Sequence, residues 1–478
     1  MNKKTQTIHF TRLCTVAAIM GASLLMLGCA DHYDGDESWS PQVQNATLTS
    51  PSAGDISVTS SADGSTMTIA WPVVYGAGGY AVALYNVNNP DAPQLVGTDT
   101  IDGCSYQTAR EEDTNYSFEL RTLGNTRYNN REAQETTKFA FNTFLPTYKE
   151  IPDGSDLRAW FNENPIPEDS ASHLCYDLAP GGNYTVSGTI DFGGHQVTLR
   201  SSSKANYANI TMQAGSTFKT YAGFTLKYLN IDAEVLNHSV ITFSDEPDES
   251  IQNLIGEKGC YFIMDPVVIQ GCNIAKLGTS IVTNSTAKYD VRVVSINNTV
   301  VEFDKTIPAA NSAAFVYMKA GFITDFTIKN STVYSREHTD CFFIQHGGRP
   351  KDVSDEEQRY VSIVNCTLAN LAYGKNFCDY HNGQTTYHYT LKNTIVVDCG
   401  KPNFLTGLNK GQASDNPIWD VNNNTCWRDG ADASASQTGI KNPGAWLSTD
   451  PGIDPANAKF TPAAAQQEAG QGDPRWLE

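Results

Sequence analysis

The sequence predicts an all-β protein in which a β-sandwich is followed by a parallel β-helix. Short runs that alternate apolar and polar residues fill residues 44–145, and turn-forming Gly, Asn, Asp and Pro separate them. From residue 151 onward a degenerate motif, apolar-x-Asn-x-Thr-apolar, recurs at irregular intervals. This pattern is typical of a solenoid whose loops vary in length while its wall does not. A short amphipathic segment, residues 156–161, lies near the start of the second range.

The first 28 residues have the pattern of an export signal. Three basic residues precede an apolar run, residues 13–27, which is shorter than the ~20 residues that a membrane-spanning helix needs. The run ends in the letters MLGC, which resemble a bacterial lipobox. We therefore expect cleavage before Cys29 and attachment of lipid to it, with plain secretion as the alternative. Residues 29–43 are acidic and polar and are predicted to form a flexible tether.

Residues 44–145 are predicted to form an antiparallel sandwich. Strand-like runs include STMTIAW, GYAVALYNV, NYSFELRTLG and TKFAFNTF. Trp71 and Tyr116 lie in these runs, and we expect both to pack in the core. Their arrangement resembles a fibronectin type III module, in which a tryptophan on the second strand packs the core. That resemblance implies a spacer role.

The segment DLRAWF, residues 156–161, predicts a short capping helix at the start of the β-helix, residues 151–478. Leu157, Trp160 and Phe161 fall on one helical face, and Ser155 can cap the N-terminus. The first strands of a solenoid present unpaired edges, so a covering helix would protect them.

The recurring motif gives the turns of the solenoid. The aligned positions are Asn230, Asn273, Thr299, Thr332, Thr367, Thr394 and Thr425. Parallel strands of neighbouring turns lie ~4.8 Å apart. At that spacing, asparagines at the bends can stack and bond amide to amide along the axis.

Charge and cysteine content exclude several classes of partner. The formal net charge is −19, and the expected signal removes only bases. This argues against nucleic acid and against a polyanion bound over a broad face without local bases or calcium. The eleven cysteines contain no CxxC pair, so no zinc site is predicted. His338 and His346 flank a strand, so they cannot share one metal ion.

Two segments carry the residue types that bind sugars. His346 and Arg349 are expected on a loop after the strand CFFIQ, and FCDYHNGQTTYHYT follows one turn later. Aromatic rings stack on sugar faces, while amides and imidazoles bond hydroxyls. The candidate glycan-binding residues are Tyr380, His381, Asn382, Tyr387, His388, Tyr389, His346 and Arg349. The alternative is that these residues belong to the wall, its bends or a packed loop.

No catalytic constellation stands out. A β-helix lyase needs acids, usually holding calcium, and an arginine or lysine base. A hydrolase needs two or three aspartates on adjacent turns. Lys319, Arg336 and Arg349 could serve as bases, but no motif marks them, and the acids fall at different phases of their turns. We expect no cofactor, with calcium as an open alternative, and enzymatic activity stays open.

Two further stretches carry a family resemblance. LAPGGNYTVSGTI followed by HQVTLRSS resembles the first turn of pectate-lyase-like right-handed β-helix proteins. GDPRW, residues 472–476, resembles the end of Bacteroidota surface lipoproteins of unknown function, which combine a lipobox, a fibronectin type III-like module and a β-helix. The resemblance implies an outer-membrane protein, anchored through Cys29 and facing the cell exterior, that accompanies glycan-uptake systems, frequently for pectic polysaccharides.

The sequence therefore favours a lipid-anchored glycan-binding protein that captures polysaccharide, pectic by resemblance, for an outer-membrane transporter complex. One alternative is a polysaccharide lyase or hydrolase that acts on pectic chains. Another is a structural or adhesive partner of an uptake complex.

Overall fold

The computed structural model describes residues 43–61, 66–170, 173–255, 258–304, 314–348, 358–380, 386–400, 404–409, 417–430, 445–446 and 449–477. The chain divides into two compact units between Leu145 and Pro146. Among the described residues, no helix is long and apolar enough to cross a membrane. The predicted signal peptide and Cys29 lie outside these residues, so both stay predictions.

The first unit is a β-sandwich of two antiparallel sheets around one apolar core. Trp71 packs against Tyr80 and Phe118 with ring centroids 5.5 and 5.7 Å apart. Trp71 and Tyr116 are both buried, as predicted. The likeness to fibronectin type III stays a prediction. One sheet contains β1 (Ser57–Ser60), β2 (Thr66–Ala70) and β5 (Ser105–Ala109), and the other contains β4 (Gln94–Ile101), β3 (Tyr80–Asn86), β6 (Asn115–Thr122) and β7 (Thr137–Asn142).

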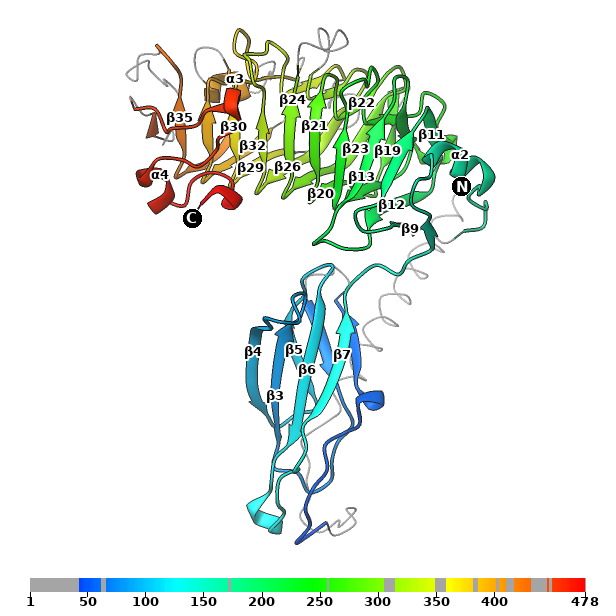
Figure 1. Ribbon diagram of the computed structural model, residues 1–478, viewed down its shortest axis with the longest axis vertical. Helices are drawn as coiled ribbons and strands as arrows, with labels where there is room; N and C mark the ends of the chain where they lie inside the picture. Colours follow the sequence, from blue (N-terminus) through cyan, green and yellow to red (C-terminus); the bar gives the residue numbers. More distant parts are fainter. Residues whose placement is uncertain are drawn as a thin grey trace, which may run out of the picture. The chain divides into compact units, whose positions relative to one another are not determined.

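The second unit is a parallel β-helix, as predicted, with three long sheets along its sides (Figure 1). Successive strands enter the twelve-, ten- and seven-stranded sheets in rotation, and each pairs in parallel with its equivalent in the next turn. An antiparallel hairpin of β18 (Gln252–Ile255) and β19 (Lys258–Ile263) interrupts this order. The right-handed sense of the coil stays a prediction.

Each of the three sheets takes up its strands in chain order along the axis of the solenoid. The twelve-stranded sheet has β8 (Lys149–Ile151), β9 (His173–Leu178), β12 (Gln196–Ser201), β15 (Phe224–Lys227), β20 (Val267–Gln270), β23 (Tyr289–Asn297), β26 (Phe322–Lys329), β29 (Arg359–Val364), β32 (Tyr387–Lys392) and β34 (Ile418–Asn422), with the hairpin joined to it. The ten-stranded sheet has β10 (Asn183–Val186), β13 (Ala208–Met212), β16 (Leu229–Asp232), β21 (Asn273–Leu277), β24 (Val300–Phe303), β27 (Thr332–Tyr334), β30 (Thr367–Ala369), β33 (Ile395–Val397), β35 (Thr425–Trp427) and β36 (Ala445–Trp446). The seven-stranded sheet has β11 (Thr189–Asp191), β14 (Thr217–Thr220), β17 (Ile241–Phe243), β22 (Val282–Asn284), β25 (Val316–Met318), β28 (Ile344–His346) and β31 (Cys378–Asp379).

Apolar side chains from all three sheets fill the interior. Parallel register places each inward residue over its equivalent in the next turn. One such column, in the ten-stranded sheet, is Ile231, Ile274, Val301, Val333, Leu368, Val396 and Cys426. Full burial of an aliphatic side chain contributes about 1.5–3 kcal/mol. In a solenoid such contributions accumulate turn by turn.

Asparagines stack at the bend before the ten-stranded sheet, as predicted. Asn330, Asn365, Asn393 and Asn423 have φ values of 49° to 55°, a left-handed conformation that asparagine adopts more readily than most residues. Each amide donates a hydrogen bond to an asparagine carbonyl of the preceding turn, over 2.8–3.3 Å. A second ladder joins Asn183, Asn209, Asn230 and Asn273 within the strands.

The predicted alignment is wrong by one residue in two turns. Val300 and Ile395, not Thr299 and Thr394, are in register with Thr332. The two misaligned threonines sit in the bend, where each hydroxyl donates 2.9 Å to the carbonyl two residues earlier. The sequence motif alone does not show whether a threonine lies in the bend or in the strand.

The predicted capping helix is α2 (Leu157–Glu163). Leu157 and Phe161 are buried, and the helix packs against β10 and β11, the first strands of two sheets. The predicted cap is wrong by one residue. Asp156 is the N-cap, since its carboxylate accepts a hydrogen bond from the Ala159 N–H over 2.9 Å. The Ser155 hydroxyl instead donates to the Pro152 carbonyl.

Residues 449–477 form a segment that we name the C-terminal strap. It contains η6 (Pro455–Asn457), α4 (Ala464–Glu468) and η7 (Pro474–Trp476). Its Ile453, Phe460 and Trp476 join one apolar cluster with residues of β27, β30 and β33. The strap thus covers the outer face of the ten-stranded sheet from β24 to β35. A further helix, α3 (Phe404–Leu408), follows β33 and packs against β31.

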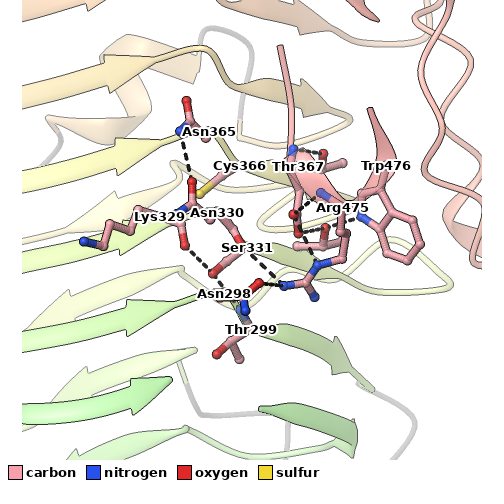
Figure 2. Close-up of polar contacts among 12 residues, drawn as sticks. Asn298, Thr299, Lys329, Asn330, Ser331, Asn365, Cys366, Thr367, Arg475 and Trp476 are labelled. Atoms are coloured by element: carbon pink, nitrogen blue, oxygen red, sulfur yellow. Dashed lines mark hydrogen bonds and ion pairs between the residues drawn. The ribbon is translucent and has the colours of Figure 1, made fainter. Parts of the chain in front are cut away.

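Polar contacts tie the strap to several turns at once (Figure 2). The Thr425 hydroxyl donates to the Gln471 amide oxygen over 2.5 Å. The buried Asp473 carboxylate accepts a bond from the Thr332 hydroxyl over 2.8 Å. Arg475 donates to Asn298 over 2.8 Å. These partners belong to different turns, so the strap runs along the axis of the solenoid.

Candidate functional site

Four predicted sugar-binding residues lie inside the β-helix, so their assignment to a glycan surface is wrong. Tyr380, Tyr387, Tyr389 and His346 are at most 2% exposed. Side chains alternate along a strand, and this alternation turns Tyr387 and Tyr389 of β32 inward. The strand expected at CFFIQ begins instead at Ile344 and ends at His346, which also points inward.

The other four predicted residues have different outcomes. His388 lies on the outer face of β32, where its ring stacks on that of Tyr360 with centroids 4.8 Å apart. Tyr360 is 40% exposed. His381, Asn382 and Arg349 lie outside the described residues.

The four inward residues belong to an aromatic and polar cluster in the interior. The Tyr380 ring lies 5.3 Å from that of His346 and 4.7 Å from that of Tyr387. The guanidinium of the fully buried Arg359 lies 4.6 Å from the Phe322 ring centroid. Within the described residues, neither ring nitrogen of His346 nor the Tyr387 hydroxyl has a hydrogen-bond partner. Because these four side chains are buried, they do not form a surface that a glycan could reach.

This cluster makes the stability of the β-helix depend on pH. Burial, followed by the positive charge of Arg359, lowers the pKa of His346 from 6.5 to about 3. The folded state therefore keeps His346 neutral, while the unfolded chain takes up a proton as the pH falls below 6.5. Stability from this residue is present above pH 6.5 and is lost as the pH falls towards 3.

Between pH 7 and pH 5, the wild type should lose about 2 kcal/mol of stability because of His346. His346→Leu should not show this part of the loss. Urea denaturation at both pH values measures this difference. The other titrating groups are common to the two proteins and cancel in the comparison. Equal losses in both proteins would contradict a depressed His346 pKa.

The described surface contains a groove of about 440 Å³ on the outer face of the seven-stranded sheet. It lies over β17, β22 and β25, whose outward residues Thr242, Thr283 and Tyr317 are in register. Serine, threonine and asparagine make up most of the remaining lining. His238 and Lys319 also line it. A polar groove with one aromatic ring offers hydrogen bonds and a stacking surface together.

The outward residues of the seven-stranded sheet form one column along the axis, which we name the outer column. Parallel register places its members ~4.8 Å apart. They are Asp191, Lys219, Thr242, Thr283, Tyr317, Gln345 and Asp379. The groove lies over the middle of this column.

The backbone fixes the hydroxyl groups of the groove. Thr279 donates to the His238 carbonyl over 2.8 Å, and Thr283 donates to the Tyr317 carbonyl over 2.8 Å. A hydroxyl that donates its proton keeps its lone pairs for a ligand. Among the described residues, the Tyr317 phenol, the His238 ring and the Lys319 amine make no hydrogen bond or ion pair. The groove therefore offers oriented acceptors together with free donors.

Asp245 supplies the negative charge in the groove lining. Partial burial alone would raise the pKa of its carboxyl, but bonds from the backbone and side chain of Thr286 hold that pKa below its usual value. Asp245 is therefore ionised at neutral pH. With Lys319 it gives the lining one charge of each sign.

The sequence singled out one residue of this groove, Lys319, as a base that no motif marked. Thr242, Thr283 and Tyr317 read as ordinary strand residues, and only strand register brings them together. Within the described parts of the chain, no group of three or more acidic, histidine or cysteine side chains could hold a metal ion.

Three family models match successive parts of the chain, and each describes a domain of unknown function. They are DUF4992 over residues 4–178, DUF4957 over residues 182–336 and DUF5123 over residues 361–476. The first match runs through the sandwich, α2 and β9. No curated protein matches the chain.

Two solved structures of pectate lyase PelI from Erwinia chrysanthemi are similar to this chain at low identity. The first is 9% identical and covers 61% of this chain and 86% of that chain, with a TM-score of 0.16. The second, in complex with tetragalacturonic acid, is 10% identical with the same coverages and a TM-score of 0.14. Superpositions this weak carry no argument about activity or substrate. The chain is thus similar over most of its length to three domain families of unknown function.

Proposed function

We propose that this protein captures a polysaccharide in the groove over β17, β22 and β25. The observation that carries the proposal is the lining itself, in which fixed hydroxyl and amide groups surround one tyrosine on an open sheet face. Sugar hydroxyls bond such groups in both directions, and a sugar ring can stack on Tyr317.

The sequence supplies the cellular context of this proposal. Lipid on Cys29 would anchor the protein to the outer membrane, with residues 29–43 as tether and the sandwich as spacer. The captured chain would pass to a transporter complex, and the family resemblance favours pectic polysaccharides as the source. These steps rest on the sequence patterns alone.

Affinity electrophoresis of the chain without its lipidated N-terminus tests the proposal. Gels containing homogalacturonan, rhamnogalacturonan or arabinan should retard the protein in at least one case. We expect Tyr317→Ala to weaken that retention about fivefold or more, as loss of an aromatic anchor does.

Tyr360→Ala is the matched control, because Tyr360 is an exposed tyrosine on the outer face of a different sheet. Its retention should equal that of the wild type. Loss of retention in Tyr360→Ala, with Tyr317→Ala unaffected, would move the site to the His388 face. Retention by no gel would refute glycan capture.

A second candidate function, a polysaccharide lyase, is favoured by the Lys319 amine, which has no partner among the described residues and lies in the groove. A lysine side chain can act as the general base of a lyase after it has lost its proton. Ultraviolet absorbance of unsaturated uronate products, followed with and without calcium, separates the two functions. Rising absorbance that Lys319→Met abolishes would identify a lyase.

A further inference from the structure

We propose that the groove selects uncharged glycan chains over polyuronates. The inference rests on the proposed capture function and adds the chemical class of the ligand. The observation behind it is the charge pattern of the outer column and of the groove that lies over it.

Among the described residues of the outer column, the one lysine is already paired. At one end the Lys219 ammonium already pairs with Asp191 over 2.7 Å. Asp379 stands at the other end. A polyuronate lying along the column would therefore meet no unpaired lysine among the column residues.

The middle of the outer column carries no charge. Thr242, Thr283, Tyr317 and Gln345 occupy four successive turns. Their hydroxyl and amide groups match the hydroxyls of a neutral sugar chain. None of these four residues offers a counter-charge to a carboxylate, and Lys319 is the one lysine in the groove lining.

The groove lining is electrically balanced. Lys319 offers one positive charge, and the ionised Asp245 offers one negative charge. A chain with an acid on every sugar needs several cations in a row. The net charge of −19 adds long-range repulsion to this local mismatch. Lys319 is better suited to donate hydrogen bonds to hydroxyls.

A matched pair of polysaccharides isolates the effect of charge. Homogalacturonan is used with its carboxyls methyl-esterified and, from the same batch, de-esterified, and arabinan is added as a neutral chain. We expect retention by the neutral chains, weak retention by the acidic chain, and little change at ~1 M salt, where the Debye length is ~3 Å. Calcium should not reverse the order.

Two variants sharpen the test. Lys319→Met should weaken retention of the neutral chain about twofold or less, whereas a uronate site would lose its cation and its binding. Gln345→Lys adds a cation to the outer column and should strengthen retention of the acidic chain at low salt only. Stronger retention of the acidic chain by the wild type, with or without calcium, would overturn the inference and leave glycan capture intact. No retention of any chain would overturn the proposed function itself.

Discussion

Alanine at Tyr387 should destabilise the β-helix by about 3–5 kcal/mol, the usual cost of truncating a buried aromatic residue. Its side chain is 1% exposed, and its ring lies 4.7 Å from that of Tyr380 and 5.8 Å from that of Tyr389. The substitution leaves a cavity between turns that cannot collapse without shifting the strands. Urea denaturation followed by circular dichroism measures the loss.

Two variants show whether burial is the cause. Tyr387→Phe removes a buried hydroxyl that has no partner among the described residues. This variant should be at least as stable as the wild type, with a gain of at most about 1–3 kcal/mol. Tyr360→Ala truncates an exposed tyrosine and should cost less than about 1 kcal/mol. Equal losses for Tyr387→Ala and Tyr360→Ala would show that Tyr387 is not a core residue.

Phe460→Ala should release the C-terminal strap, also at a cost of about 3–5 kcal/mol. Phe460 is 3% exposed and lies 4.7 Å from the Tyr334 ring and 5.4 Å from the Trp476 ring. Its loss removes one apolar contact between the strap and the ten-stranded sheet, the contact with Tyr334 of β27. Limited proteolysis should then cut the strap while the turns stay protected, since local opening exposes a segment to protease.

Lys459→Ala is the matched control for this prediction. Lys459 precedes Phe460 in the strap and is exposed, so its substitution should change stability by less than about 0.5 kcal/mol. Unchanged proteolysis of the strap in Phe460→Ala would mean that polar contacts, such as that of Asp473 with Thr332, hold it without the apolar cluster.

The sequence predicted the solenoid because its asparagines carry a positional signal. Asn365 and Asn393 must adopt positive φ and bond one another across turns, and few residue types do both. That signal marks one bend and the ten-stranded sheet that follows it. No residue type marks the bends before the other two sheets in this way, so the bounds and the register of their strands were not predictable.

The failure of the predicted site has a physical reason. Tyr387, His388 and Tyr389 alternate inward and outward with the period of a strand. Their polar groups led to the prediction of a sugar-binding loop. Burial of a tyrosine depends on the width of the interior at that turn, which the local sequence does not encode. The sequence did not predict the groove, because Thr242, Thr283 and Tyr317 are far apart in the chain. Only the register of the strands brings them together.

The C-terminal strap also has a consequence for the order of folding. Its partners Asn298, Thr332 and Thr425 lie on separate turns, so it can dock only after those turns have stacked in register. The strap follows all of these turns in the chain, so it is synthesised after them. A stack with a slipped or missing turn offers the wrong spacing and leaves the strap undocked and open to protease. Once docked, it must detach before the last turns can peel away, so it acts late in folding and chiefly slows unfolding. The strap can therefore make all of these contacts only on a coil in which the turns from Asn298 to Thr425 are present and in register.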